Sequence, residues 1–446
     1  MGKQSTVFIC QNCGSQYTSW MGRCSNCNQW NTLIEEIKEE KESVGGEKKG
    51  KMQLLSLSSI SSEKITRIAT GFSEFDLILG GGIVKGSLIL LSGEPGVGKS
   101  TLLLQLVQNL LNNQEKFQIL YISGEESPEQ IKIRAERLEN SDKNLTTDKS
   151  LLVASETIIE KIITSIEEEK PSLLIIDSIQ TVFSEKLNSY PGSVSQVRFC
   201  ANEIMRAIKR LKIPTFIVGQ VTKEGIVAGP KVLEHLVDVV LQIEGGEAQD
   251  FRLLRSLKNR FGNTDEIGIF QMGERGLTEV KNPSAVFLDE HESNIPGSVK
   301  TVFLEGKRCL LAEIQALIVP NYFPPLRRTA TGIDYNRLLL LVAVLERRLG
   351  LKLQNKDIYI KVSGGLKLQD PAIDLAVCGA IISAYQNKVL SNNIVMVGEI
   401  GLLGEVRGVS QLNKRIKEAN KQGFKNVYSS QSYKNLLDIQ KVLNRD

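Results

Sequence analysis

The sequence predicts an α/β protein with a small cysteine-rich module at its start and a separate α+β domain at its end. Four of the seven cysteines fall within the first 35 residues. From about residue 64, apolar runs of strand length alternate with helical segments, which suits a largely parallel sheet buried on both faces. After residue 250 the pattern changes to hairpins, and Pro283 opens a region of mixed strands and helices. These changes divide the chain into a module (1–35), a linker (36–63), a core domain (64–282) and a C-terminal domain (283–446).

The composition limits the function without naming it. The chain has 446 residues, of which 41% are hydrophobic and 24% charged, so several domains with sizeable cores can form. The net charge of +4 is a weak excess, so any surface that binds nucleic acid must be local. No stretch approaches 18 consecutive apolar residues, and the start "MGKQSTVFIC" lacks the apolar segment of a signal peptide. An odd cysteine count without a secretion signal indicates a reducing compartment, so we expect a cytoplasmic protein with no membrane partner.

Two cysteine pairs, "CQNC" at 10–13 and "CSNC" at 24–27, predict a structural metal site. Each pair can place two thiolates on one cation, and two pairs complete a tetrahedral site of four sulfurs. Zn²⁺ favours such closed sites and needs no redox partner, although a pair of redox dithiols is the alternative. The expected zinc ligands are Cys10, Cys13, Cys24 and Cys27. Contact with nucleic acid and contact with protein both stay open as roles. Trp20, Arg23 and Trp30 are available for stacking, but packing against the cysteine turns is the favoured interpretation.

The segment "GEPGVGKST" at 93–101 predicts a phosphate-binding loop (P-loop). It matches G-x-x-x-x-G-K-[ST], follows an apolar strand and precedes an apolar helix, which is the context that this motif requires. Its glycines let backbone N–H groups turn toward phosphates at the start of the helix. We expect Lys99 to reach the β- and γ-phosphates of ATP and Ser100 to ligate Mg²⁺. The expected nucleotide-binding residues are Gly93, Glu94, Pro95, Gly96, Val97, Gly98, Lys99, Ser100 and Thr101.

Three further strand-like runs end in polar residues that suit the same chemistry. Asp177 closes "LLIID" and is expected to hold the Mg²⁺ through its water shell. Glu125 follows "YISG" and can orient the attacking water, or it is a solvated loop acid. Gln220 closes "FIVGQ" and can sense the γ-phosphate, or it makes a simple hydrogen bond at the end of a strand. This order of motifs resembles the RecA-like ATPase core. The resemblance implies a P-loop ATPase fold with Lys99 and these three residues as its catalytic groups.

Two segments between core strands carry scattered cations. They are 184–199, "SEKLNSYPGSVSQVRF", and 222–232, "TKEGIVAGPKV". In RecA-like rings and filaments such loops face the nucleic acid, and flexible backbone with cations suits contact without sequence readout. The expected DNA-binding residues are Lys186, Arg198, Lys223 and Lys231. Ordinary surface loops are the alternative.

The stretch "KNRFG" at 258–262 follows a strand-like run at the end of the core. On an extended segment, Lys258 and Arg260 point the same way. Similar stretches in ring helicases imply that these cations act on ATP bound by a neighbouring subunit, where a trans-acting arginine contributes roughly 10³–10⁵ in rate. Contact with DNA phosphates and a structural hairpin are the alternatives.

The region from about 283 resembles the proteolytic domain of Lon, which uses a serine within D-G-P-S-A-G and a distant lysine. The comparable stretch here is "QDPAIDLAV" (369–377), where Ala372 follows the proline, and Asn413 stands where the lysine is expected. Lys414 is adjacent, but one step on a helix turns the side chain by about 100°. Without a hydroxyl there is nothing for a base to activate, so we expect a non-proteolytic scaffold.

Together the motifs resemble a bacterial family of DNA repair ATPases that joins a zinc finger, a RecA-like core and a Lon-protease-like domain. The resemblance covers essentially the full length. It implies a DNA-dependent ATPase that works with the RecA recombinase on single-stranded and branched DNA, driving branch migration or strand unwinding as a homo-oligomer, in the form of a six-membered ring, near the nucleoid. A RecA-like signalling ATPase and an ATP-dependent protease are the competing interpretations; the second lacks a nucleophile.

Overall fold

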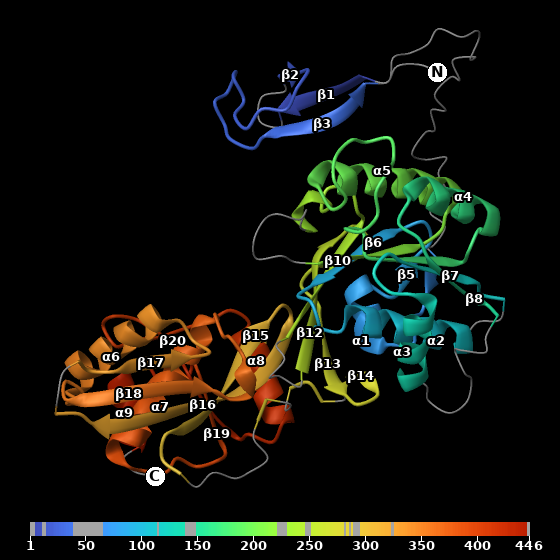
Figure 1. Cartoon of the computed structure of the whole chain (residues 1–446). Coiled ribbons are helices and arrows are strands. Elements are labelled where there is room, and N and C mark those ends of the chain that lie inside the picture. Colours follow the sequence, from blue (N-terminus) through green and yellow to red (C-terminus); the bar gives the residue numbers. More distant parts are fainter. Residues whose placement is uncertain are drawn as a thin grey trace, which may run out of the picture. The chain divides into compact units, whose positions relative to one another are not determined.

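The computed structural model describes most of the chain in two compact units, Met1–Glu279 and Val280–Asp446, each with a hydrophobic core of its own (Figure 1). The described residues are 5–10, 15–38, 66–113, 116–138, 149–220, 230–245, 251–280, 282–284, 287–288, 295–322 and 325–443. The division into four parts that the sequence suggests stays a prediction, and nearly all of its linker, 36–63, lies outside the described residues. No helix in the described ranges is long and apolar enough to cross a membrane.

The N-terminal module is a small antiparallel sheet. Its strands are β1 (Ser5–Cys10), β2 (Gln16–Tyr17) and β3 (Leu33–Lys38), in the order β2-β1-β3. The buried side chains at its centre are Cys10, Cys24 and Leu33, with Phe8, Tyr17, Met21 and Cys27 packed against them. So small an apolar centre cannot hold a fold by itself, which is the situation in which a structural metal stabilises a module.

The first unit is built on a nine-stranded sheet, in the order β14-β13-β12-β11-β6-β10-β9-β7-β8. The strands from β11 to β8 in this order run parallel, and the other three pair antiparallel at one edge. The strands are β6 (Leu88–Gly93), β7 (Ile119–Ser123), β8 (Leu151–Ser155), β9 (Leu173–Asp177), β10 (Thr215–Gln220), β11 (Val239–Glu244), β12 (Phe251–Asn259), β13 (Ile267–Gly273) and β14 (Gly276–Glu279). The five apolar runs of the sequence, at 87–92, 118–123, 172–177, 214–221 and 237–243, form β6, β7, β9, β10 and β11, and each of these strands has a neighbouring strand on both sides.

Helices cover the two faces of this sheet (Figure 1). They are α1 (Ser73–Leu79), α2 (Lys99–Asn113), α3 (Pro128–Leu138), α4 (Ile159–Glu169) and α5 (Val194–Leu211), with the short pair β4 (Arg67–Ile68) and β5 (Ile83–Val84) and the 3-10 turn η3 (Pro230–Val232). Alternate residues of each strand enter different cores, as a period of two requires. Ile89 and Leu91 of β6 pack with α1, α2 and α3, whereas Leu88 and Leu90 pack with α4 and α5. Both faces are therefore closed, and the carboxyl ends of the parallel strands meet at one edge.

Strand β12 contains a bulge that re-aims its last residues. Ser256 pairs with Leu241 and Lys258 pairs with Val240, so Leu257 is an extra residue in the ladder. Residues directly opposite each other share a face of the sheet. Ser256 therefore faces the core of α1 and α2, as Leu241 does, whereas Lys258 faces the core of α4 and α5, as Val240 does.

The second unit is an α+β fold around a six-stranded sheet, in the order β17-β18-β16-β15-β19-β22. Its strands are β15 (Ser298–Glu305), β16 (Arg308–Pro320), β17 (Arg328–Thr331), β18 (Lys356–Val362), β19 (Ile394–Val397) and β22 (Asn426–Ser429), with the separate pair β20 (Glu399–Ile400) and β21 (Val406–Arg407). Its helices are α6 (Tyr335–Leu349), α7 (Asp374–Gln386), α8 (Leu412–Lys421) and α9 (Leu436–Leu443), with the 3-10 turns η4 (Ser363–Gly365) and η5 (Pro371–Ile373). The ends of α6 have clear causes: the side chain of Asp334 accepts from the N–H of Arg337, and Gly350 adopts a φ of 68° after the last turn.

The region compared with the Lon active site is closed by an ion pair. Ala372 is fully buried in η5, where its methyl group offers no nucleophile. The predicted counterpart of the lysine, Asn413, accepts a hydrogen bond from Gln431 at 3.0 Å. Arg415 of α8 is 1% exposed and is bound to Asp370, and it also donates to the carbonyl of Val302 at 3.0 Å. These contacts fix the turn before Ala372. The serine and lysine that Lon uses for catalysis have no counterparts at Ala372 and Asn413.

Candidate nucleotide site

The P-loop joins β6 to α2 with a lysine turned into it. Gly96 and Gly98 have backbone φ angles of 75° and 109°, which residues other than glycine rarely adopt. Lys99 is 7% exposed, and its Nζ donates to the carbonyls of Gly93 at 3.0 Å and Glu94 at 2.9 Å. Burial lowers the pKa of Lys99, while Asp177 and Glu125 act against this shift. The loop thus wraps a buried cation, as a phosphate cradle needs.

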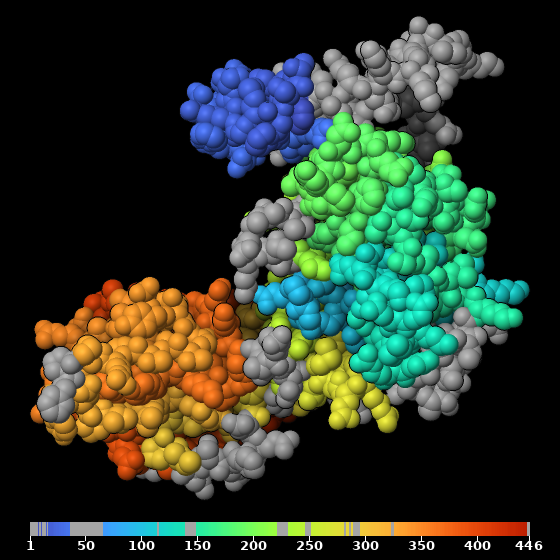
Figure 2. Space-filling view, in the orientation of Figure 1, coloured from blue at the N-terminus to red at the C-terminus, as the bar shows by residue number. Residues whose placement is uncertain are grey.

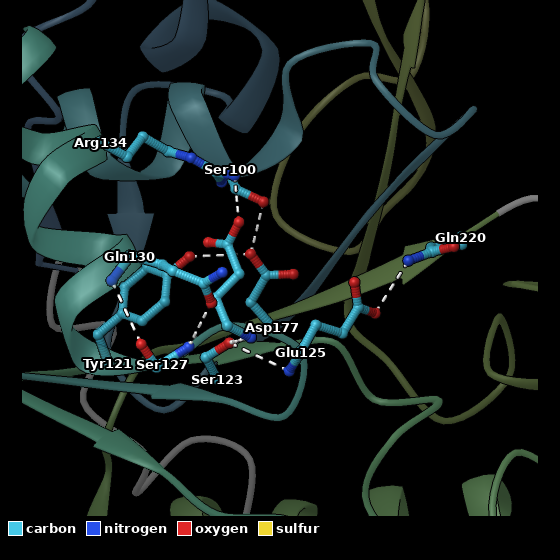
Figure 3. A network of polar contacts seen from close by, with 10 residues as sticks. Ser100, Tyr121, Ser123, Glu125, Ser127, Gln130, Arg134, Asp177 and Gln220 are labelled. Atoms are coloured by element: carbon cyan, nitrogen blue, oxygen red, sulfur yellow. Dashed lines mark hydrogen bonds and ion pairs between the residues drawn. The ribbon is translucent and has the colours of Figure 1, made fainter.

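Ser100 and Asp177 lie together at the start of α2 (Figure 3). The hydroxyl of Ser100 donates to Oδ2 of Asp177 at 2.6 Å. Tyr121 of β7 donates to the same oxygen at 2.8 Å. Burial, with the charge of Asp177 next, raises the pKa of Tyr121 far above its usual range, so the phenol stays a donor. A hydroxyl and a carboxylate at this distance are the hard oxygen donors that Mg²⁺ prefers, so the residues fit that ion.

Glu125 is held by side chains from two neighbouring strands. The amide of Gln220, at the end of β10, donates to Oε1 of Glu125 at 2.9 Å (Figure 3). The hydroxyl of Ser178, directly after β9, donates to the same oxygen. The structure therefore brings together Lys99, Asp177, Glu125 and Gln220 as the sequence suggested, although their catalytic roles stay predictions. The remaining P-loop positions, from Glu94 to Val97, form the turn that follows Gly93 at the end of β6.

The sequence interpretation missed several supporting residues. Tyr121 sits inside an apolar run and resembles a core residue. Arg134 of α3 pairs with Glu126, whose pKa is raised mainly by burial and lowered by that arginine. Arg252 of β12 is 6% exposed and donates through Nε to the carbonyl of Val97 at 3.1 Å, which ties the P-loop to the antiparallel edge of the sheet. A charged residue inside the strand-like run "FRLLRSL" is the signal that could have found Arg252.

Lys258 and Arg260 face the connection between η3 and β11. Nζ of Lys258 donates to the carbonyls of Glu234 at 2.6 Å and Val237 at 2.9 Å. Burial, and then the charge of Arg260, lowers the pKa of Lys258. The Arg260 side chain is 54% exposed and pairs with Asp238 at 3.2 Å. Both cations point the same way, as predicted, but Lys258 is anchored whereas Arg260 is open to solvent.

The predicted DNA-binding residues lie on different elements. Lys186 is exposed in the segment before α5, and Lys231 is exposed in η3. Arg198 lies on α5, so the segment 184–199 is not a loop throughout: Ser193 caps a helix that begins at Val194. Lys223 lies outside the described residues. Their role in binding DNA stays a prediction.

Three of the four predicted zinc ligands meet in the N-terminal module. The sulfurs of Cys10, Cys24 and Cys27 lie within 4.8 Å of one another, and Cys13 lies outside the described residues. Tyr17 lies 3.3 Å from the sulfur of Cys24 and, with backbone donors, lowers the pKa of that thiol to about 6, which favours the thiolate. A soft, close-set thiolate cluster fits Zn²⁺.

Three families match successive parts of the chain. Residues 8–35 match the rubredoxin metal-binding domain of the LapB zinc ribbon, residues 68–266 match the KaiC ATPase family, and residues 341–432 match the ChlI subunit of Mg-chelatase. The ribbon match supports a zinc site on the cysteine cluster. The ATPase match covers the P-loop, the strand that leads to Glu125 and the strands that end at Asp177 and Gln220. The fold is therefore a RecA-like ATPase with a zinc ribbon before it and a ChlI- and Lon-like domain after it.

Curated relatives match the chain over nearly its whole length. The DNA repair protein RadA of Streptococcus pyogenes is 49% identical over 444 residues, which cover 98% of this chain and 95% of the relative. The protein of the same name from Bacillus subtilis is 50% identical over 432 residues, 96% and 93% of the two chains. That from Listeria monocytogenes is 47% identical over 431 residues, 96% and 92%. The chain therefore belongs to the bacterial RadA family.

Proposed function

We propose that this chain is a DNA-dependent ATPase of DNA repair, which drives branch migration or strand unwinding on recombination intermediates. One observation carries the ATPase part of the proposal: the start of α2 and the ends of three strands bring one polar cluster together, made of Lys99, Ser100, Glu125, Asp177 and Gln220. The names of the relatives support the DNA repair part.

The roles within one site follow from the contacts. Lys99 exchanges two loop carbonyls for the phosphate oxygens of ATP, which requires no change in its burial. Ser100 and, through the water shell, Asp177 would hold Mg²⁺, and the ion would supply positive charge against the charge that develops on the phosphates. Glu125 orients the attacking water, and Gln220 holds Glu125 until a γ-phosphate competes for its amide.

The position of Lys258 and Arg260 supports a role at a neighbouring subunit's ATP. In the ladder, Lys258 pairs with Val240, and Val240 pairs with Leu90, three residues before Gly93. This places Lys258 about 10 Å along the sheet from the start of its own P-loop, toward the opposite end. We propose that Arg260 reaches across the interface of a homo-oligomeric ring, with six subunits as the resemblance implies, and that Lys258 holds the turn.

DNA is the partner that couples hydrolysis to work. We propose that single-stranded or branched DNA contacts Lys186, Arg198, Lys223 and Lys231, and that the chain acts together with the RecA recombinase near the nucleoid. Gln220 lies two residues before the segment 222–232, which contains Lys223, so contact with DNA there can alter the hydrogen bond from Gln220 to Glu125.

The test is ATP hydrolysis by the full chain with and without single-stranded DNA, beside the Lys99→Ala variant. We expect DNA to raise the rate in the unsubstituted protein and Lys99→Ala to show no hydrolysis in either condition. Hydrolysis that DNA leaves unchanged would instead favour a signalling ATPase. Degradation of casein would favour the protease, which the buried Ala372 argues against.

A further inference from the structure

The zinc module exposes both of its tryptophans. The exposed fractions of Trp20 and Trp30 are 59% and 68%, and no other large apolar side chain that the structure describes in the module is comparably exposed. The core of the module uses Cys10, Cys24 and Leu33 instead. The expectation that the indoles pack against the cysteine turns is therefore wrong for most of their surface. The rings are available to a partner (the module is blue in Figure 2).

The backbone holds the two rings beside each other. The N–H of Asn31 donates to the carbonyl of Gly22 at 2.8 Å, and Arg23 and Trp30 form an antiparallel bridge. A Cβ atom on Gly22 would lie 3.7 Å from Cζ3 of Trp30 and 3.8 Å from Cη2 of Trp20. Both rings therefore lie against Gly22, a residue without a side chain.

One cation and several amides surround the rings. The guanidinium carbon of Arg23 lies 5.7 Å from the centroid of the Trp30 ring, and its Nε donates to the carbonyl of Asn28 at 3.0 Å. The side chains of Asn28, Gln29 and Asn31 are exposed nearby in the sequence. No Asp or Glu occurs between Cys10 and Ile34, so no carboxylate from this stretch opposes a phosphate at this surface.

This chemistry fits a nucleobase better than a peptide. Bases offer flat π-faces for the indoles, polar edges for the amides and a phosphate for the arginine. Trp and Arg also recur at protein interfaces, but the described surface of this module adds no exposed large aliphatic side chain to them, and the stretch 11–34 has no carboxylate. We propose that Trp20, Trp30 and Arg23 form a stacking site for single-stranded DNA. The proposal rests on the proposed function, in which the chain works on DNA.

The sequence supplies an unusually clean probe for this site. The chain contains two tryptophans, and both are here, so the intrinsic tryptophan fluorescence of the full protein reports on this surface alone. Titration of the zinc-loaded full chain with a thymidine homo-oligonucleotide should quench the emission and shield the indoles from acrylamide. Trp30→Ala should weaken binding of the oligonucleotide roughly 5- to 100-fold, and Trp30→Phe should restore most of the loss.

A salt titration separates stacking from charge. Because one arginine contributes, Arg23→Ala should reduce the slope of log affinity against log salt by only about 0.7. Zinc content, measured on each variant, shows whether the module is still folded. Thr18→Ala, at another exposed position of the module, serves as a control that should bind normally.

The outcomes distinguish this site from the proposed function. If the oligonucleotide stimulates hydrolysis of ATP but leaves tryptophan emission and its acrylamide quenching unchanged, the stacking site is wrong while the DNA-dependent ATPase stands. If the RecA recombinase changes the emission and the oligonucleotide does not, the surface binds protein and the proposal is overturned. Loss of affinity in Trp30→Ala with normal zinc content, rescued in Trp30→Phe, supports it.

Discussion

Two arginine–aspartate pairs, one in each unit, differ mainly in which partner is buried. In the first unit, Arg260 is 54% exposed while Asp238 is 5% exposed. In the second unit, Arg415 is 1% exposed and Asp370 is 12% exposed. Arg415 also donates to the carbonyls of Val302 and Ser410, at 3.0 Å and 2.9 Å.

The difference separates an arginine that can change partners from one that cannot. An exposed guanidinium gives up little when it leaves Asp238, because water solvates the guanidinium and Lys209 still pairs with the buried carboxylate at 2.5 Å. A buried guanidinium without its carboxylate would be left as an unpaired charge, which costs several kcal/mol. Burial therefore indicates which of the two serves another molecule and which holds its own turn.

The largest expected effect is on hydrolysis, at Arg260. Arg260→Ala should slow DNA-stimulated ATP hydrolysis roughly 10³- to 10⁵-fold, because a trans-acting arginine is absent, while the free energy of unfolding changes by less than about 1 kcal/mol. The measurement is the steady-state rate beside equilibrium binding of a fluorescent ATP analogue, which should be unchanged. A loss of nucleotide affinity would mean that Arg260 serves its own subunit.

A mixing experiment makes the trans assignment decisive. Subunits with Arg260→Ala and subunits with Lys99→Ala are each inactive alone. In mixed oligomers some sites combine an intact Lys99 with an intact Arg260 from the neighbour, so part of the activity should return. Inactivity at every mixing ratio would contradict the interface role.

The second largest effect is on stability, at Arg415. Arg415→Leu should destabilise the second unit by about 3–5 kcal/mol, since Asp370 is left largely buried without its cation. Hydrogen exchange of the α8 and β15 amides is the local measurement, and Arg407→Leu, whose side chain is exposed, is the matched control. If hydrogen-exchange protection of these amides were unchanged in both variants, Arg415 would not stabilise the second unit, and the contrast between the buried Arg415 and the exposed Arg260 would fail.

A smaller effect is expected at the carboxylate that we assign to the metal. Tyr121→Phe removes one of two hydrogen bonds to Oδ2 of Asp177 and should raise the Mg²⁺ concentration for half-maximal binding of a fluorescent ADP analogue about tenfold. Tyr385→Phe, in the second unit, should leave this value unchanged. A fall in the maximal hydrolysis rate with an unaltered Mg²⁺ requirement would show that Tyr121 only packs.

The pH dependence of the P-loop follows from the lowered pKa of Lys99. As pH rises, the ammonium loses its proton earlier than an exposed lysine would, so ATP affinity should fall at alkaline pH. Because the pKa of Lys99 is lower in the folded state than in the unfolded state, the contribution of this group to stability is present above the unfolded-state pKa and is lost as pH falls through the folded-state pKa. The free energy of unfolding should therefore rise with pH over the range in which ATP affinity falls. Isothermal titration at several pH values measures the first, and Lys258→Ala should keep the same profile. Parallel falls in both quantities would indicate general alkaline unfolding.

The last substitution, Ala372→Ser, is expected to have no effect on proteolysis. Ala372→Ser supplies a hydroxyl at the position of the Lon nucleophile, but Arg415 is committed to Asp370 and Asn413 stands where the lysine is expected. We therefore expect no casein degradation from this variant. Any peptidase activity would show that the second unit retains a working base.

One geometric rule let the sequence predict that the side chains of the nucleotide site lie together, although their roles stay predictions. The carboxyl ends of parallel strands share an edge, so Glu125, Asp177 and Gln220 had to meet the P-loop once their strands were recognised. The sequence could not reveal Tyr121, because its hydroxyl contact depends on which strands are neighbours. It also missed the start of α5, where the capping Ser193 was taken as part of a loop.

Exposure was the least predictable property. Two tryptophans beside cysteine turns suggest a core, yet three buried side chains already fill that centre and the rings lie outside. Likewise, the sequence treats Lys258 and Arg260 as equals, whereas the fold anchors one on backbone carbonyls and leaves the other open.

The bulge at Leu257 decides which way the end of β12 faces. Arg252 binds the P-loop at one end of this strand, and Lys258 turns to the other face at the far end because of a single extra residue. If the same residues paired in a regular ladder, Lys258 would share the α2 face of Ser256 and could no longer donate to the carbonyls of Glu234 and Val237. We therefore expect chains that diverge from this one to keep the bulge while they exchange many of the residues around it.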